Sequence, residues 1–173
     1  MTISKATIED VPALHELVNR AYRGEESLRG WASEANILDG ARIDTDTLTE
    51  YINDKDITIL KYTSDAGEIE ACVYLEAQGE KLYLGMLSVL PHLQDKGLGR
   101  RLLQEAELFA KNMNKPVITM TVITTRHQLI DWYVRRGYQR TGKRLPFHAE
   151  TKFGIPKVPI ELEVLEKLVD EIE

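Results

Sequence analysis

The sequence predicts a single α/β domain built around a sheet. Helical and strand-like patterns alternate along the 173 residues, with no internal repeat and no low-complexity segment. Apolar residues at spacings of three and four indicate the helices, and runs rich in β-branched residues indicate the strands. A chain of this length can bury one continuous core, so we expect one domain over residues 1–173.

The first helix is the clearest element of the N-terminal half. After a short strand at 3–6, apolar residues recur at helical spacing: Val11, Leu14, Leu17, Val18 and Ala21. A looser segment containing Trp31 follows, and Thr45, Asp46 or Thr47 is expected to cap a second helix. Three strands are then predicted, at 57–61, 69–77 and 82–90, the first two joined by a turn at 65–67.

The C-terminal half predicts two more helices separated by a strand. They span 97–113 and 127–136, on either side of a β-branched strand at 117–123. Gly137 is a suitable residue to end the second of these helices. Two final strands are predicted at 138–143 and 161–168, with a proline-containing loop between them.

Composition excludes several classes of partner. The formal net charge is −6 and no lysine- or arginine-rich tract is present, so we expect no nucleic-acid partner. No apolar run approaches the length of a membrane span, and the first residues lack the apolar core of a secretory signal. The single cysteine, Cys72, lies among strand-like residues and is interpreted as a small core residue. We expect a cytoplasmic protein with no membrane contact and no metal site.

The segment after the strand at 82–90 has the features of an anion site. Its residues are Gln94, Asp95, Lys96, Gly97, Leu98, Gly99, Arg100 and Arg101, and they lead directly into a helix. Unpaired N–H groups and the dipole of a helix N-terminus favour a phosphate, and glycines permit close approach to the backbone. The glycine patterns of dinucleotide-binding and Walker-type loops are absent. A plain helix-entry turn with solvated basic residues is the alternative.

The pattern Gln94-x-x-Gly97-x-Gly99 resembles the pyrophosphate-binding signature of the GCN5-related N-acetyltransferases, the GNAT superfamily. A second marker of that family, a helix ending in Tyr-x-x-x-Gly-Tyr, is matched by Tyr133, Gly137 and Tyr138. The order of elements also matches nearly end to end, and the layout resembles an uncharacterised bacterial subfamily. The resemblance implies the acyl-CoA N-acyltransferase fold: a central mixed, mostly antiparallel sheet that is splayed at its middle and flanked by helices.

The resemblance also assigns roles for acetyl-CoA. The strand before the phosphate turn splays from its neighbour in this family, so main-chain N–H groups of Leu87, Ser88 and Val89 are expected to bind the pantetheine and polarise the thioester. Tyr133 holds the place of the family's general acid, since a phenol stays protonated at neutral pH. The alternatives are that residues 87–89 form an ordinary, fully paired strand and that Tyr133 is only a core residue.

The sequence departs from the family pattern at two points. Arg126 stands where many relatives have a pantetheine-binding asparagine, and the strand at 82–90 contains no acidic residue that could serve as the base. Glu34 and Glu76 remain as candidates for that role. Glu34, with Tyr22 and Trp31, lies where relatives build the acceptor wall and could anchor an ammonium ion, although a solvated glutamate is the plainer reading.

The expected function is transfer of an acetyl group from acetyl-CoA to a primary amine of a small molecule or peptide, directly within a ternary complex. A non-catalytic acyl-CoA-binding module, acting as a sensor or scaffold, is the alternative, and binding of another nucleotide is a third possibility. The segment 144–159 is expected to cover the acceptor site or to pack against a second subunit in a homodimer.

Overall fold

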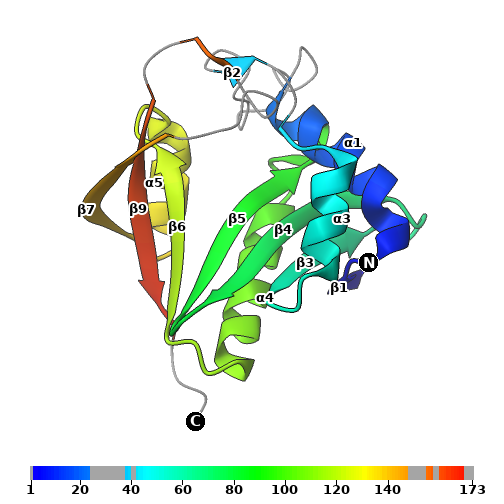
Figure 1. Ribbon diagram of the computed structural model, residues 1–173, viewed down its shortest axis with the longest axis horizontal. Helices are drawn as coiled ribbons and strands as arrows, with labels where there is room; N and C mark the ends of the chain where they lie inside the picture. Colours follow the sequence, from blue (N-terminus) through cyan, green and yellow to red (C-terminus); the bar gives the residue numbers. More distant parts are fainter. Residues whose placement is uncertain (1, 24–37, 40–41, 148–154, 158–159, 170–173) are drawn as a thin grey trace.

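The computed structural model describes residues 2–23, 38–39, 42–147, 155–157 and 160–169, and these form a sheet covered by helices on both faces (Figure 1). The sheet has seven strands, in the spatial order β1 (Thr2–Lys5), β3 (Ile57–Thr63), β4 (Ile69–Gln78), β5 (Lys81–Val89), β6 (Val117–Ile123), β9 (Glu161–Leu168) and β7 (Gln139–Pro146). Every neighbouring pair is antiparallel except β5 and β6, which are parallel. The predicted mixed, mostly antiparallel sheet is confirmed.

Two helices cover each face of the sheet. Helices α1 (Val11–Tyr22) and α3 (Thr45–Asn53) pack on one face, and α4 (Leu98–Asn112) and α5 (His127–Arg135) pack on the other (Figure 1). The five apolar residues that predicted the first helix are its five buried residues. Short 3-10 turns, η1 (Ile8–Asp10) and η2 (Pro91–Leu93), precede α1 and α4. No helix within the described ranges is long and apolar enough to cross a membrane.

The cap of α3 differs from the prediction. The capping residue is Asp44, whose Oδ1 accepts a hydrogen bond of 2.7 Å from the N–H of Thr47, and Thr45 is already the first helical residue. Aspartate and threonine are both good caps, so the sequence alone could not decide which of the adjacent residues takes that position.

The C-terminal segment is more regular than expected. Strand β7 continues to Pro146, because Arg144, Leu145 and Pro146 pair with Glu163, Leu162 and Glu161 of β9. Part of the predicted loop at 144–159 is therefore strand. A second, two-stranded sheet joins β2 (Leu38–Asp39) to β8 (Ile155–Pro156), and the sequence did not predict it. This pairing connects the two segments that were expected to border the acceptor site.

The sheet opens between β5 and β6. These strands pair only where Lys81, Leu82 and Tyr83 face Val117, Ile118 and Thr119. Beyond this point they diverge (Figure 1), while β5 stays paired with β4 up to Val89 and β6 stays paired with β9 up to Ile123. A register shift between Cys72 and Tyr74 marks a bulge in the β4–β5 pair, where Met86 has a φ of 51°. Because a bulge bends its strand, it helps to direct β5 away from β6.

Candidate active site

The open edge of β5 presents backbone N–H groups to the gap. The N–H of Leu90 donates to the Glu70 carbonyl of β4 at 3.0 Å, so it points away from the gap. Backbone direction alternates along a strand, so the N–H of Ser88 also faces β4, while those of Leu87 and Val89 face the open side. The buried Ser88 side chain donates to the Met86 carbonyl at 3.0 Å. Of the three residues predicted to bind pantetheine, two therefore have amides facing the gap.

Two side chains occupy the carbonyls of that same edge. The Tyr22 hydroxyl donates to the Leu87 carbonyl, and the Gln94 amide nitrogen donates to the Val89 carbonyl at 3.1 Å. Tyr22, predicted to bind the acceptor, and Gln94, predicted to bind pyrophosphate, thus both hold the splayed strand. Because these carbonyls are occupied, the edge of β5 offers mainly backbone N–H donors. Such donors suit a ligand with amide or thioester carbonyl oxygens.

The turn between β5 and α4 ends in a helix N-terminus with unpaired amides. The first hydrogen bond of α4 runs from the Arg101 N–H to the Gly97 carbonyl at 3.1 Å, so the N–H groups of Leu98, Gly99 and Arg100 precede it. Gly97 is the N-cap and has a φ of 84°, which disfavours any residue with a Cβ. A Cβ added there would meet no atom within 4 Å, so the outer face of the turn is open. Asp95 and Lys96 are exposed beside it.

At Gly99, also predicted to leave room for a phosphate, an added side chain would contact the protein itself. A Cβ added at Gly99 would lie 3.4 Å from Cη2 of Trp132 and 3.8 Å from Cγ2 of Val89. It would therefore point into the interface between α4 and α5, away from the open face of the turn. At these distances an added methyl group would make ordinary contacts with Trp132 and Val89.

A basic groove of about 520 Å³ continues from this turn between α4, α5 and β9. Its lining residues are Arg100, Leu103, Gln104, Glu107, Arg135, Arg136, Gly137 and Lys167. Arg136 lies 4.2 Å above the Trp132 ring centre, and Lys167 contacts Glu107. Arg100 and Arg135 are exposed and form no ion pair within the described residues. Arg100 was predicted as part of the turn, but the groove was not predicted; its signal in the sequence is the pair Arg135 and Arg136 at the end of α5.

Tyr133 lies on α5, in the core that α4 and α5 form on their face of the sheet. It is 5% exposed and packs edge-to-face on Trp132 and Tyr138, with ring centroids 5.1 and 5.7 Å away. Burial raises the pKa of Tyr133 well above its usual value, the nearby Tyr22 and Tyr83 hydroxyls act in the same direction, and the Arg126 charge opposes them. The phenol is therefore neutral at all ordinary pH values and can act as a hydrogen-bond donor.

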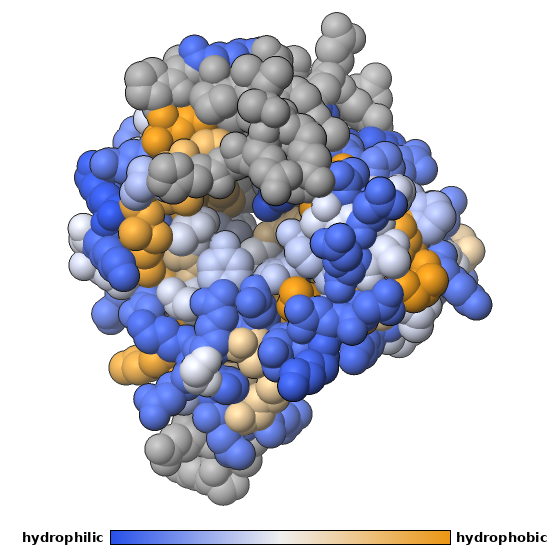
Figure 2. All heavy atoms as spheres, in the orientation of Figure 1, coloured by the Kyte–Doolittle hydropathy of each residue, from blue (hydrophilic) through white to orange (hydrophobic). Residues whose placement is uncertain are grey.

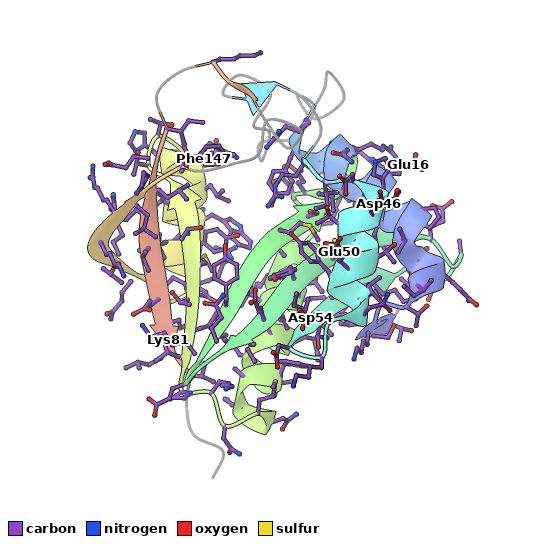
Figure 3. All side chains as sticks on the ribbon, in the orientation of Figure 1. Glu16, Asp46, Glu50, Asp54, Lys81 and Phe147 are labelled. Atoms are coloured by element: carbon purple, nitrogen blue, oxygen red, sulfur yellow. The ribbon has the colours of Figure 1, made fainter. Side chains whose placement is uncertain are left out.

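The face of the sheet that carries α1 and α3 is the expected acceptor side, because Tyr22 of α1 was predicted to bind the acceptor. Figure 2 shows the molecule hollowed between the β6–β9 half and the α3 half, and Figure 3 shows side chains from both halves extending toward this opening. Glu76 of β4 lies on this face, where its carboxylate accepts a 2.5 Å hydrogen bond from the Tyr74 hydroxyl. Glu34 and Trp31 lie outside the described residues. Arg126 is the N-cap of α5.

Comparisons with known proteins were made for the whole chain. A family model described as an acetyltransferase (GNAT) domain matches residues 28–163. No curated protein matches the chain.

Similar solved structures include the ribosomal-protein-S18-alanine N-acetyltransferase from Escherichia coli, with a TM-score of 0.74 and 16% identity over 99% of this chain and 96% of that one. They also include the PaiA N-acetyltransferase from Thermoplasma acidophilum in complex with coenzyme A, with a TM-score of 0.66 and 20% identity over 97% and 99%. A spermidine N-acetyltransferase chimera of Vibrio cholerae and hSSAT sequences has a TM-score of 0.69 and 17% identity over 96% and 94%. At these identities the structures show a shared fold.

Proposed function

The chain belongs to the GNAT family of acetyltransferases, and we propose that it moves an acetyl group from acetyl-CoA to a primary amine by direct transfer within a ternary complex. The observation that carries the proposal is the open edge of β5. Its two outward amides, Leu87 and Val89, lead directly to the unpaired amides at the start of α4, and the buried phenol of Tyr133 lies in the core that α4 and α5 form.

The residues present fit coenzyme A in three successive parts. The amides of Leu98, Gly99 and Arg100 would bind the diphosphate at the helix N-terminus, beside the open face of Gly97. The N–H groups of Leu87 and Val89 would bind carbonyl oxygens of the pantetheine and the thioester. Arg100 and Arg135 of the basic groove would receive the remaining phosphate charge. The resemblance in fold to a coenzyme A complex supports this placement.

The chemistry requires four changes that balance. When bound, acetyl-CoA supplies the acetyl group as a thioester. The acceptor ammonium first loses one proton; its nitrogen then bonds to the acetyl carbon, the carbon–sulfur bond breaks, and a second proton leaves the nitrogen while the thiolate takes one up. The products are an amide and a thiol, with one proton released overall. Tyr133 would donate a hydrogen bond to the departing sulfur. Because burial raises the pKa of Tyr133 further above that of a thiol, stabilisation of the thiolate dominates over complete proton transfer.

The amine class follows from what the similar proteins are named for. One is named for the alanine of a ribosomal protein and another for spermidine, so this fold serves both peptide and small-molecule amines. We propose an amine of one of these two kinds.

We also propose that residues 1–173 form one cytoplasmic domain, and that a second copy would dock at the C-terminal strands, where β7 is an exposed edge. The lack of any carboxylate in β5 favours the alternative, an acyl-CoA-binding module without transfer.

Thiol release from acetyl-CoA with a panel of primary amines tests the proposal. We expect Tyr133→Phe to lower kcat at least about tenfold, because one donor to the leaving sulfur is lost, while calorimetry gives coenzyme A affinity within about threefold. Tyr138→Phe is the matched control: Tyr138 is also buried in this aromatic cluster, and its hydroxyl has no hydrogen-bond partner within the described residues. Its kcat should be unchanged.

Three outcomes separate the alternatives. Unchanged turnover in Tyr133→Phe removes the role of that phenol. Tight coenzyme A binding without thiol release for any amine supports the binding module. Absence of any heat on titrating coenzyme A into the folded protein contradicts both functions.

A further inference from the structure

A cluster of three tyrosines surrounds Glu76 on the acceptor side of the sheet. Tyr51 of α3 and Tyr74 of β4 meet edge-to-face at 4.9 Å between ring centroids, and Tyr74 meets Tyr83 of β5 at 6.2 Å. Tyr74 and Glu76 are two residues apart in β4, so both project from the same face, and the Tyr74 hydroxyl donates to the Glu76 carboxylate at 2.5 Å. Glu76 also lies directly opposite Tyr83 in the β4–β5 register. We call these four residues the tyrosine box.

Tyr83 connects the tyrosine box to the point where the sheet opens. It is the last residue of β5 that pairs with β6, and its ring leans along the strand over Gly85. A Cβ on Gly85 would lie 3.0 Å from Cε1 of that ring, so only glycine leaves room for it. The Tyr83 hydroxyl then lies 3.4 Å from Oγ1 of Thr121 on β6. The ring therefore spans the start of the gap between the two strands.

The position of Tyr83 also separates Glu76 from the reacting centre. The Tyr83 hydroxyl lies at the β6 side of the gap, beside Thr121. Glu76 lies opposite the backbone of Tyr83, across the β4–β5 ladder. Tyr133 belongs to the core on the face of α4 and α5, whereas Tyr74 and Tyr83 pack on the face of α1 and α3, so a group bound to Glu76 would lie apart from the Tyr133 phenol. Glu76 is thus better placed to hold a remote part of the acceptor than to deprotonate its reacting nitrogen.

In the part of the chain that the structure describes, no cation forms an ion pair with the Glu76 carboxylate. Three other carboxylates on the sheet or beside it are paired: Glu163 with Arg140 at 2.5 Å, Glu166 with Lys81 at 2.7 Å and Asp10 with Lys61 at 2.8 Å. Within the described residues, Glu76 has the Tyr74 hydroxyl and no basic partner, although it is half-buried among aromatic rings. A carboxylate in such a place is stabilised by a cation, and tyrosine faces attract the same group.

We propose that the tyrosine box is the subsite for a second cationic group of the acceptor, which makes the acceptor a diamine or polyamine. The remote ammonium would contact the Glu76 carboxylate beside the tyrosine rings, while the reacting amine, one short alkyl chain away, reaches the gap beneath Tyr133. This inference rests on the proposed function, since it names the acceptor for the same transfer. Arg42 acts electrostatically on Tyr51, and its guanidinium lies 5.8 Å from the Tyr22 ring centre. This positive charge would instead favour an acceptor whose far end is anionic.

Three four-carbon amines that differ only at the far end provide the test. They are 1,4-diaminobutane, n-butylamine and 4-aminobutanoate, with cationic, apolar and anionic ends. We expect kcat/KM for 1,4-diaminobutane to exceed that for n-butylamine at least about tenfold, the usual effect of one charged hydrogen bond. Glu76→Gln should remove this advantage, so that 1,4-diaminobutane and n-butylamine give similar kcat/KM. Glu70→Gln, at another half-buried glutamate of β4, is the control and should retain the advantage.

A binding measurement keeps the test independent of turnover. Calorimetric titration of 1,4-diaminobutane into the protein saturated with coenzyme A should give a Kd at least about tenfold weaker for Glu76→Gln than for Glu70→Gln. Equal preference for the diamine and n-butylamine, preference for 4-aminobutanoate, or equal effects of the two substitutions would each overturn the inference. If amines are acetylated without these differences, the inference fails and the proposed function stands. If coenzyme A does not bind, the proposed function itself fails.

Discussion

The two glycines of the phosphate turn should respond oppositely to alanine. Gly97 has a φ of 84°, in the region that disfavours a Cβ, so alanine there costs about 1–2 kcal/mol of backbone strain. No steric term adds to this, because an added Cβ meets no atom within 4 Å. Gly99 lies inside α4 with no positive φ, and its added Cβ would make an ordinary contact with Trp132 at 3.4 Å. Alanine is better than glycine in a helix by about 1 kcal/mol.

The expected results follow from these magnitudes. Gly97→Ala should lower the free energy of unfolding by about 1–2 kcal/mol, and Gly99→Ala should leave it unchanged or raise it by up to about 1 kcal/mol. Relief of the strain at Gly97 would rotate the first amides of α4, so coenzyme A should bind roughly 5- to 30-fold more weakly to Gly97→Ala. Gly99→Ala should bind it as the wild type does.

Urea denaturation and calorimetry with coenzyme A measure both quantities. Gly97→Asn serves as a conservative control, since asparagine tolerates positive φ better than alanine and should fall between the wild type and Gly97→Ala. If Gly99→Ala proves more destabilising than Gly97→Ala, or loses more affinity, the assignment of backbone strain to Gly97 and of an ordinary side-chain contact to Gly99 is wrong.

Two further predictions concern stability. Burial raises the pKa of the Cys72 thiol from 9.0 to about 12. The contribution of this group to the free energy of unfolding is therefore complete below pH 9. Above that pH the thiol ionises first in the unfolded chain, and the free energy of unfolding falls by up to about 1.4 kcal/mol per pH unit. Urea denaturation between pH 8 and 10 should show this fall in the wild type and a smaller one in Cys72→Ala, and parallel curves would contradict it. Asn19 of α1 accepts from the Arg42 N–H at 2.6 Å and donates to the Ile43 and His15 carbonyls at 3.1 and 2.9 Å, so it anchors the start of the segment that leads into α3. Asn19→Ala should cost about 2–3 kcal/mol in the same assay, whereas Asn112→Ala, at the exposed end of α4, should cost nearly nothing; equal costs would show that the anchor is unimportant.

Elements with a strong local pattern were predicted closely. The strands 117–123 and 161–168 have the predicted bounds, and Gly137 has the positive φ of 97° expected after a helix. Their signals are β-branched runs, alternation and a glycine stop, and each is contained within a few residues. Such signals do not depend on what the element packs against.

Elements that depend on distant partners were missed or misplaced. The β2–β8 pair has two residues on each side, too few to show any periodicity, and exists only because 38–39 and 155–156 meet in space. Strand β7 extends to Pro146 because β9 is there to pair with it, although its own residues are polar and exposed.

The sequence by itself determined the order of elements, the family and the two glycine-marked helix ends, because local periodicity, capping and backbone conformation are properties of short segments. Only the tertiary structure decided which groups face the gap: that the amides of Leu87 and Val89 point outward while Ser88 faces β4, and that Tyr22 and Gln94 hold the strand's carbonyls. It also placed Glu76 behind the Tyr83 ring. Such placements follow from strand register and the bulge at Met86, and register is set by pairing with residues far away in the chain.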